Sequence, residues 1–183
     1  ADQQALALTL ANRPGLEKMK IIYNYIRNNY QWNKFKGIYA DPGLKTLYNK
    51  KTGSSSLINF ALINLLKEAG LEAYPMIVRE RGHGKINTKI PFISQFNNTY
   101  AAVIIDDKQY FLNAIDPLTP AHLTPYSILN TTGLIIKRNE GILVQIREDN
   151  LKYEDNIFIQ AVLSENNVLA GKVHLASKNY ARA

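Results

Sequence analysis

Three consecutive serines at the start of a largely apolar segment are the residues of this sequence best placed for chemistry. Ser54, Ser55 and Ser56 follow Gly53, and the apolar segment runs to Leu66. A glycine turn followed by small polar residues predicts the N-terminus of a helix, where a serine hydroxyl caps the first unpaired N–H groups. The same N–H groups and the helix dipole favour negative charge, so one of these serines is a candidate nucleophile.

A serine nucleophile needs a neighbouring base, and the sequence offers few. The chain has no cysteine, which removes thiol nucleophiles, disulfides and thiolate metal sites together. Its three histidines are His83, His122 and His174. Their spacing is not that of metal ligands, so we expect no metal and no cofactor. His83 lies between two glycines and could swing toward Ser55, although a loop histidine is more often simply exposed.

The elements that must position these residues form an α+β pattern, with helices first and an antiparallel sheet after them. Helical spacing of apolar residues predicts an amphipathic helix over 16–32, and Asp41-Pro42 indicates a short helix within 38–51. The central helix opens at the serines and ends before Gly70, and its apolar residues surround most of its circumference, as in a buried helix. A strand is predicted over 72–79, where Pro75 favours a sheet edge or the beginning of a strand.

A hairpin is the clearest feature of the second half of the chain. The strands cover 99–105 and 109–114, and they are joined across Asp106-Asp107-Lys108. A long loop over 81–96 precedes them, and such loops are often functional. Further strands are predicted at 133–137, 141–147, 156–163 and 168–175. We expect three parts: a lead-in over 1–15, a main domain over 16–140, and a β-strand extension over 141–183 that begins a further β-domain.

Charge and hydropathy limit the kinds of partner that the sequence predicts. The net charge of +7 over 183 residues is spread along the chain rather than gathered in a stripe with interleaved aromatic residues, so we expect no nucleic-acid partner. No apolar run approaches the roughly 18 residues of a membrane span, so we expect no transmembrane segment. No signal peptide is visible at the start, and the abrupt end suggests a piece of a longer multidomain protein.

Several segments together resemble the transglutaminase-like domain of bacteria, over about residues 16–137. They are Lys51-Thr-Gly-Ser-Ser-Ser56 with its buried helix, Lys67-Glu-Ala-Gly-Leu-Glu-Ala-Tyr-Pro-Met-Ile-Val78, Phe96-Asn-Asn98 and Tyr110-Phe-Leu-Asn-Ala-Ile-Asp-Pro117. The resemblance implies a papain-type fold with a buried central helix packed on an antiparallel sheet. In active members of that family a Cys opens the helix, a His begins the next strand and an Asp lies on its hairpin partner.

Laid on this sequence, those catalytic positions fall on Ser55, Asn98 and Asn113. With a two-residue hairpin loop, the two asparagines share a face of the sheet as diagonal neighbours, about 7–8 Å apart between α-carbons. An amide cannot take a proton at neutral pH, and it cannot stabilise an imidazolium. We therefore expect a degenerate triad and no catalytic residues.

The closest resemblance is to a subset of the family from the cell envelope of Gram-negative bacteria, in which a β-domain follows the transglutaminase-like domain. This implies an exported, periplasmic or envelope-associated pseudoenzyme that binds a peptide, a glycan or an envelope protein. The expected groove is formed by residues near the old active site: Trp32, Ser54, Ser56, His83 and Asn97. Two alternatives stay open, namely a hydrolase or acyltransferase that uses Ser55 by a non-standard route, and a purely structural spacer between β-domains.

Overall fold

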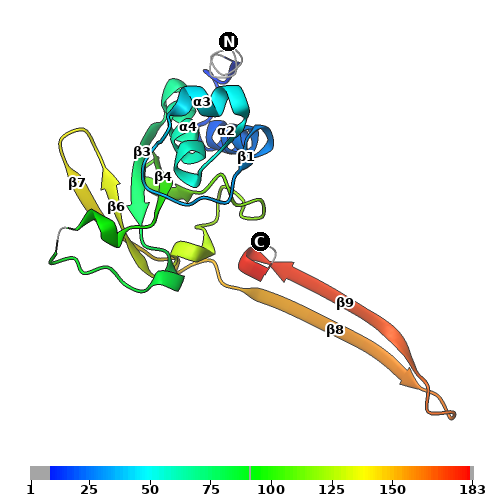
Figure 1. Cartoon of the computed structure of the whole chain (residues 1–183). Coiled ribbons are helices and arrows are strands. Elements are labelled where there is room, and N and C mark those ends of the chain that lie inside the picture. Colours follow the sequence, from blue (N-terminus) through cyan, green and yellow to red (C-terminus); the bar gives the residue numbers. More distant parts are fainter. Residues whose placement is uncertain (1–8, 91, 182–183) are drawn as a thin grey trace. The chain divides into compact units, whose positions relative to one another are not determined.

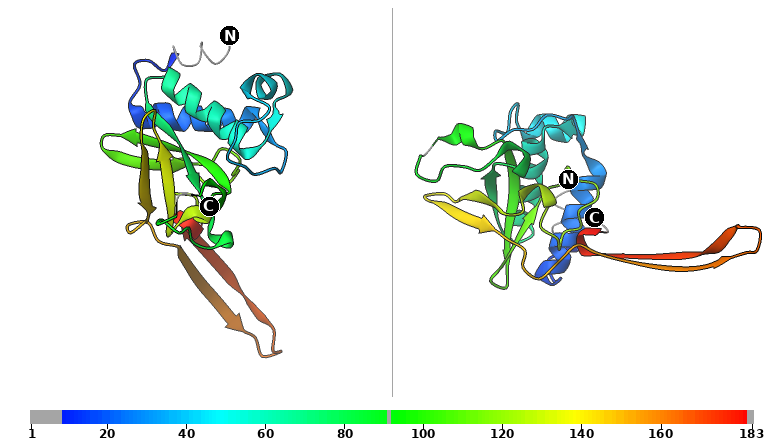
Figure 2. Two further views of the ribbon diagram at one scale, coloured as in Figure 1. Left: turned by 60° about the vertical axis from the view of Figure 1, so that its left-hand side comes forward. Right: turned by 90° about the horizontal axis from the view of Figure 1, so that it is seen from below.

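The computed structural model describes residues 9–90 and 92–181, and the chain divides into two compact units, Ala1–Arg147 and Glu148–Ala183. The first unit contains all the candidate site residues. Its α-helices gather on one side of a five-stranded sheet (Figures 1 and 2). The expected α+β arrangement, with helices first and an antiparallel sheet after them, is therefore confirmed. Most of the predicted lead-in, residues 1–8, lies outside the described residues.

In the described part of the chain from Gly15 onward, three α-helices precede the sheet: α2 (Gly15–Asn29), α3 (Leu44–Lys50) and α4 (Ser55–Glu68). The predicted helix over 16–32 ends earlier than expected, at Asn29. The residues after it form β1 (Gln31–Trp32), which pairs in parallel with β2 (Thr52–Gly53). Gly53 is needed at that contact, because a Cβ there would come within 2.8 Å of the Leu47 side chain. This short pairing brings the chain after α2 beside the turn that opens α4.

The main sheet has the strand order β5-β4-β3-β6-β7, and every pairing in it is antiparallel. Its strands are β3 (Glu72–Val78), β4 (Asn98–Ile105), β5 (Lys108–Leu112), β6 (Thr131–Ile136) and β7 (Gly141–Ile146). Short 3-10 helices lie at η1 (Arg81–His83), η2 (Ile93–Gln95), η3 (Tyr126–Ile128) and η4 (Asn179–Ala181).

The predicted hairpin is present as β4 and β5, joined by a two-residue turn. Asp106 and Asp107 both have positive φ, 49° and 60°, which is the backbone of a type I′ turn and matches the twist of the flanking strands. The register pairs Ala101 with Leu112 and Ile105 with Lys108. The two-residue loop expected from the sequence therefore sets the pairing.

The position of Pro75 differs from the expectation of a sheet edge or a strand beginning. Strand β3 is the central strand, with β4 on one side and β6 on the other. Strand β6 pairs only with Met76–Val78, so β3 is locally an edge at Pro75 and the missing N–H costs no ladder bond on that side. The expectation that a proline lies at a sheet edge therefore holds for Pro75 itself, although β3 as a whole is not an edge strand.

Two apolar clusters fill the two sides of the sheet. The larger one packs α2 and α4 against β3, β4 and β5, and its fully buried side chains include Met19, Ile22, Leu62 and Val103. The smaller one lies on the opposite face around Met76, Tyr100 and Ile146. The helix α4 is buried along most of its length, as its apolar circumference predicts.

Strand β7 closes the main sheet, although the sequence places it in the β-strand extension. It pairs with β6 along its whole length, from the pair Gly141–Ile136 to the pair Ile146–Thr131. The first compact unit accordingly runs to Arg147. The second unit is a hairpin of β8 (Glu154–Leu163) and β9 (Leu169–Lys178). Among the described residues, no helix combines the length and apolar character needed to cross a membrane.

Candidate functional site

The start of α4 is held by its three serines, each in a different way. Ser54 is the N-cap, and its Oγ accepts the N–H of Leu57 at 3.3 Å. Ser55 is completely buried, and its hydroxyl donates to Oδ1 of Asn98 at 2.6 Å. Ser56 donates to the carbonyl oxygen of Tyr39 at 2.5 Å. The capping role expected for one serine belongs to Ser54, which leaves Ser55 as the serine that faces the sheet.

A loop from Asn33 to Tyr39 covers Ser55. The N–H of Ser55 donates to the carbonyl of Phe35 at 2.9 Å, and the N–H of Gly37 donates to Ser55 Oγ at 3.2 Å. Farther along, Thr99 Oγ1 donates to the carbonyl of Ile38 at 3.2 Å. The helix N–H group that could stabilise an oxyanion is thus already paired, and both the hydroxyl proton and a lone pair of Ser55 are used inside the protein.

Asn98 turns toward Glu80 rather than toward Asn113. Its Nδ2 donates to Glu80 Oε1 at 2.9 Å, while its Oδ1 accepts from Ser55 and from the N–H of Thr99. Because an ionised carboxylate only accepts hydrogen bonds, the amide orientation is fixed, with its oxygen toward Ser55. Asn98 is 0% exposed and belongs to a continuous chain from Ser55 to Glu80.

Glu80 is the centre of this network. Its carboxylate accepts hydrogen bonds from three side chains, those of Asn98, Tyr100 and Lys36. Burial by itself would raise its pKa, but these hydrogen bonds and the charge of Lys36 outweigh burial and lower the pKa below its ordinary value. The pKa of Tyr100 is raised, first by burial and then by the neighbouring charge of Glu80. Glu80 is therefore an ionised, almost completely buried carboxylate at neutral pH.

Asn113 is part of a separate junction. Its Oδ1 accepts from Asn59 Nδ2 at 2.9 Å, and its carbonyl accepts from the hydroxyl of Tyr23 at 3.1 Å. The remaining groups of Asn59 bond the carbonyl of Thr99 and the N–H of Ala114, both at 2.8 Å. This junction ties α2 and α4 to the end of the hairpin. The two asparagines expected to act as neighbours thus have different partners.

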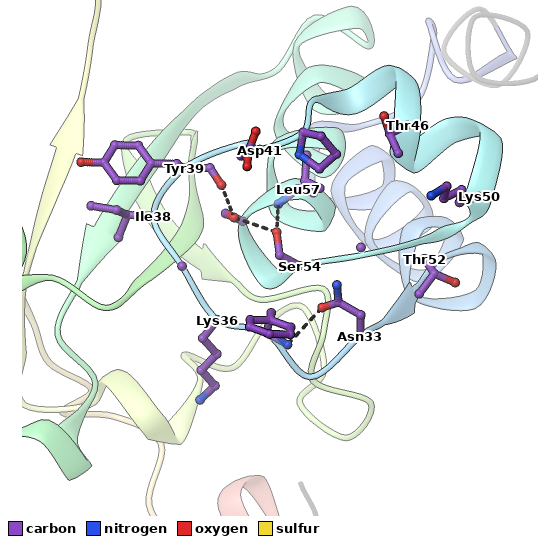
Figure 3. A pocket seen from close by; sticks show the side chains of 15 residues that line it. Asn33, Lys36, Ile38, Tyr39, Asp41, Thr46, Lys50, Thr52, Ser54 and Leu57 are labelled. Carbon is purple, nitrogen blue, oxygen red and sulfur yellow. Dashed lines mark hydrogen bonds between the residues drawn. The ribbon is translucent and has the colours of Figure 1, made fainter.

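A pocket of about 540 Å³ lies on the other side of the serine turn, between the covering loop and α3 (Figure 3). Of the residues predicted to form a groove, Ser54 and Ser56 line it, together with Lys36, Tyr39 and Asp41. The other predicted groove residues lie outside this lining: Trp32 donates from Nε1 to the Phe35 carbonyl, Asn97 Oδ1 accepts the N–H of Glu80, and His83 is exposed on η1. Of the five residues predicted to form one groove, two line this pocket and three lie elsewhere.

The site residues predicted from the sequence do not include Glu80, Asn59, Tyr100 and Lys36. Asn59 had a local signal, because it is a polar residue four positions after Ser55, on the same face of a largely apolar helix. Glu80 had a weaker signal as the single acid at the end of an apolar strand. Nothing in the sequence connects Lys36 to Glu80, since 44 positions separate them.

The chemistry available at Ser55 is limited by its partners. Its hydroxyl contacts an amide oxygen and a backbone N–H, and neither group can accept its proton at neutral pH. The only carboxylate of the network reaches Ser55 through the Asn98 amide, which does not relay a proton. The described residues also hold no cluster of three metal-ligating side chains.

Comparisons with known proteins identify the fold. No protein-family model matches the sequence, and a search of curated proteins finds no match. A solved structure of a “putative protease” from Parabacteroides distasonis superposes on 80% of this chain at 17% identity, with a TM-score of 0.55. The chain spans 27% of the length of that protein. A structure described as a TGase matches 69% of this chain and 36% of its own, at 13% identity, but its TM-score of 0.42 is too low to support an argument. What the likeness to the Parabacteroides protein establishes is a shared fold.

Proposed function

We propose that this chain carries a non-catalytic, transglutaminase-like domain that binds or organises a partner in the bacterial cell envelope. The single observation that carries the proposal is the state of Ser55. It is 0% exposed, and its hydroxyl is hydrogen-bonded to Asn98, the residue at the position of the family's catalytic base. A nucleophile must be reachable by substrate and must lose a proton, and the surroundings of Ser55 support neither step.

The transglutaminase-like assignment rests on the residue resemblance and is supported by the fold shared with the Parabacteroides protein. Under this assignment, Ser55, Asn98 and Asn113 occupy the Cys, His and Asp positions. Each keeps hydrogen-bonding capacity while the titrating group is lost. The hairpin after Arg147 would begin a following β-domain, and the whole would be exported to the periplasm or envelope. Detection of the protein in the periplasmic fraction of its host would test export.

Labelling with a serine-directed fluorophosphonate tests the loss of catalysis. We expect no labelling of the wild-type protein under conditions that fully label a known serine hydrolase. Ser55→Ala serves as the matched control, because it removes only the hydroxyl. Labelling of the wild type that disappears in Ser55→Ala would refute the proposal and establish the alternative enzyme that uses Ser55.

Restoring the family's nucleophile tests the same point from the other side. We expect Ser55→Cys to show no acyl-transfer or peptidase turnover, because Asn98 cannot deprotonate the thiol and the loop carbonyl of Phe35 still occupies the helix N–H. Turnover on peptide or glutamine-containing substrates in the single variant would mean that another residue acts as base.

A further inference from the structure

One edge of the main sheet is unprotected. Strand β7 pairs with β6 alone among the described residues, and its sequence, Gly141-Ile-Leu-Val-Gln-Ile146, contains neither a charge nor a proline. Exposed edges are normally guarded by such residues, because free backbone groups invite another strand. The opposite edge, β5, begins with Lys108 and is one residue shorter. The contrast marks β7 as the edge that is open to pairing.

The free backbone groups of β7 can be assigned. At its start, the N–H of Lys137 donates to the carbonyl of Glu140, so the backbone groups of Glu140 point toward β6. Successive residues of an antiparallel strand alternate in direction. The N–H and C=O groups of Gly141, Leu143 and Gln145 therefore point toward the open edge, spaced for pairing with an added strand.

An apolar groove of about 340 Å³ lies beside this edge. Its floor is a row of cross-strand neighbours on one face of the sheet, since Ile77 pairs with Leu134 and Leu134 pairs with Leu143. Its wall includes Phe92 and Ile93 of the loop before β4, which are 65% and 51% exposed. Apolar side chains with this much exposure are costly unless a partner covers them.

The loop that forms the wall is organised by its own hydrogen bonds. The side chain of Gln95 donates to the carbonyls of Ile90 and Asn87, at 2.7 and 3.3 Å, and accepts the N–H of Asn87 at 2.6 Å. These bonds close the loop across its base. The apolar wall is thus held in place before any partner binds, which lowers the entropy cost of binding.

The rim of the groove carries a net positive charge. Its acid, Glu140, which precedes Gly141, is paired with Lys137 at 3.7 Å. Lys85 precedes Ile86 and Lys89 precedes Ile90 in the loop, and Arg138 lies two residues after Ile136 at the turn into β7. All three are exposed, and none of them forms an ion pair with another residue in the described parts of the chain. Acidic residues beside an apolar core would complement this rim.

We propose that β7 and the adjoining groove bind an extended segment of a partner protein, with alternating apolar residues and acidic flanks. The segment adds a sixth strand to the sheet through the backbone groups of Gly141, Leu143 and Gln145. Every second side chain of the segment enters the groove, and the acidic flanks meet the cationic rim. This inference goes beyond the proposed function and does not depend on whether Ser55 reacts.

Fluorescence anisotropy with labelled probe peptides tests the proposal on the full chain. Each probe has roughly ten residues, with valine and phenylalanine alternating with threonine, and carries acidic, neutral or basic flanks. We expect the acidic probe to bind most tightly and the basic probe least. N-methylation of the amides along one edge of the bound probe should abolish binding, whereas N-methylation along the other edge should not. Equal loss from both edges, or binding no better than that of a scrambled peptide, would overturn the proposal.

Two pairs of variants locate the site. Gln145→Pro removes an outward N–H without touching the β6 ladder and should weaken binding roughly fivefold, the value of about one hydrogen bond, while Gln145→Ala should leave it unchanged. Phe92→Ala should weaken binding by loss of the apolar wall, whereas Phe35→Ala, at an exposed aromatic residue outside the groove lining, should not. Analytical ultracentrifugation is the remaining check. A dimer that Gln145→Pro dissociates would mean that β7 pairs with a second copy, and would overturn the partner assignment.

Discussion

Replacing Glu80 should destabilise the fold far more than replacing its surface partner. Glu80→Ala leaves Asn98 Nδ2, which has no other partner among the described residues, unpaired in a fully buried position. An unsatisfied buried donor costs about 1–3 kcal/mol. The Tyr100 hydroxyl keeps its bond to Ser127, so its loss is smaller, about 1 kcal/mol. The salt bridge to Lys36, whose side chain is 39% exposed, adds about 1 kcal/mol at most.

The expected loss for Glu80→Ala is therefore about 2–5 kcal/mol. Glu80→Gln can still accept from Asn98 and Tyr100 and should lose about 1–2 kcal/mol. Lys36→Ala should lose less than about 1 kcal/mol. Urea unfolding followed by Trp32, the only tryptophan and a half-buried one, measures all three.

A double-mutant cycle separates the buried hydrogen bond from the general cost of truncation. If Asn98 Nδ2 is the main group orphaned by Glu80→Ala, the second substitution in a Glu80→Ala/Asn98→Ala pair should cost much less than it does alone. Additive losses, or a Glu80→Ala variant as stable as Lys36→Ala, would refute the reasoning and remove Glu80 from the centre of the site.

Three further outcomes are expected. The folded-state pKa of Glu80 lies below its ordinary value of 4.5. Its contribution to stability is therefore present above pH 4.5 and is lost as the pH falls through the folded-state pKa. Unfolding measured over a series of acidic pH values should show this loss in the wild type and not in Glu80→Gln. Gly53→Ala should cost roughly 1–3 kcal/mol, because the new methyl group would come within 2.8 Å of Leu47, and calorimetry should show a lower Tm, with Gly82→Ala, in open space, nearly unchanged. Asp106→Asn combined with Asp107→Gly should stabilise the hairpin by roughly 0.5–1 kcal/mol, since both positions have positive φ, and an unchanged urea midpoint would contradict this.

The local elements near the site were predictable because their signals lie within a few residues. A serine after a glycine predicts a helix cap, and the structure places that cap at Ser54. Two aspartates between β-rich runs predict a tight hairpin, and the turn at Asp106 and Asp107 fixes its register. Strand neighbours were harder, because the sequence does not say which later strand pairs with the second side of β3. For that reason the sequence predicts Pro75 at a sheet edge or a strand beginning, and it predicts the strand at 141–147 as part of the following extension.

The sequence by itself determined that the positions matching the family's Cys, His and Asp hold Ser55, Asn98 and Asn113, because residue identity alone decides which side chains can titrate. Only the tertiary structure decided what these residues contact. The carbonyl of Phe35 accepts the N–H of Ser55, and Glu80 accepts a hydrogen bond from the amide of Asn98. Asn59 donates a hydrogen bond to Asn113. Each of these partners is distant along the chain. A buried polar group forms hydrogen bonds with the polar atoms that the fold places within about 3 Å of it. No local sequence pattern specifies which atoms those are.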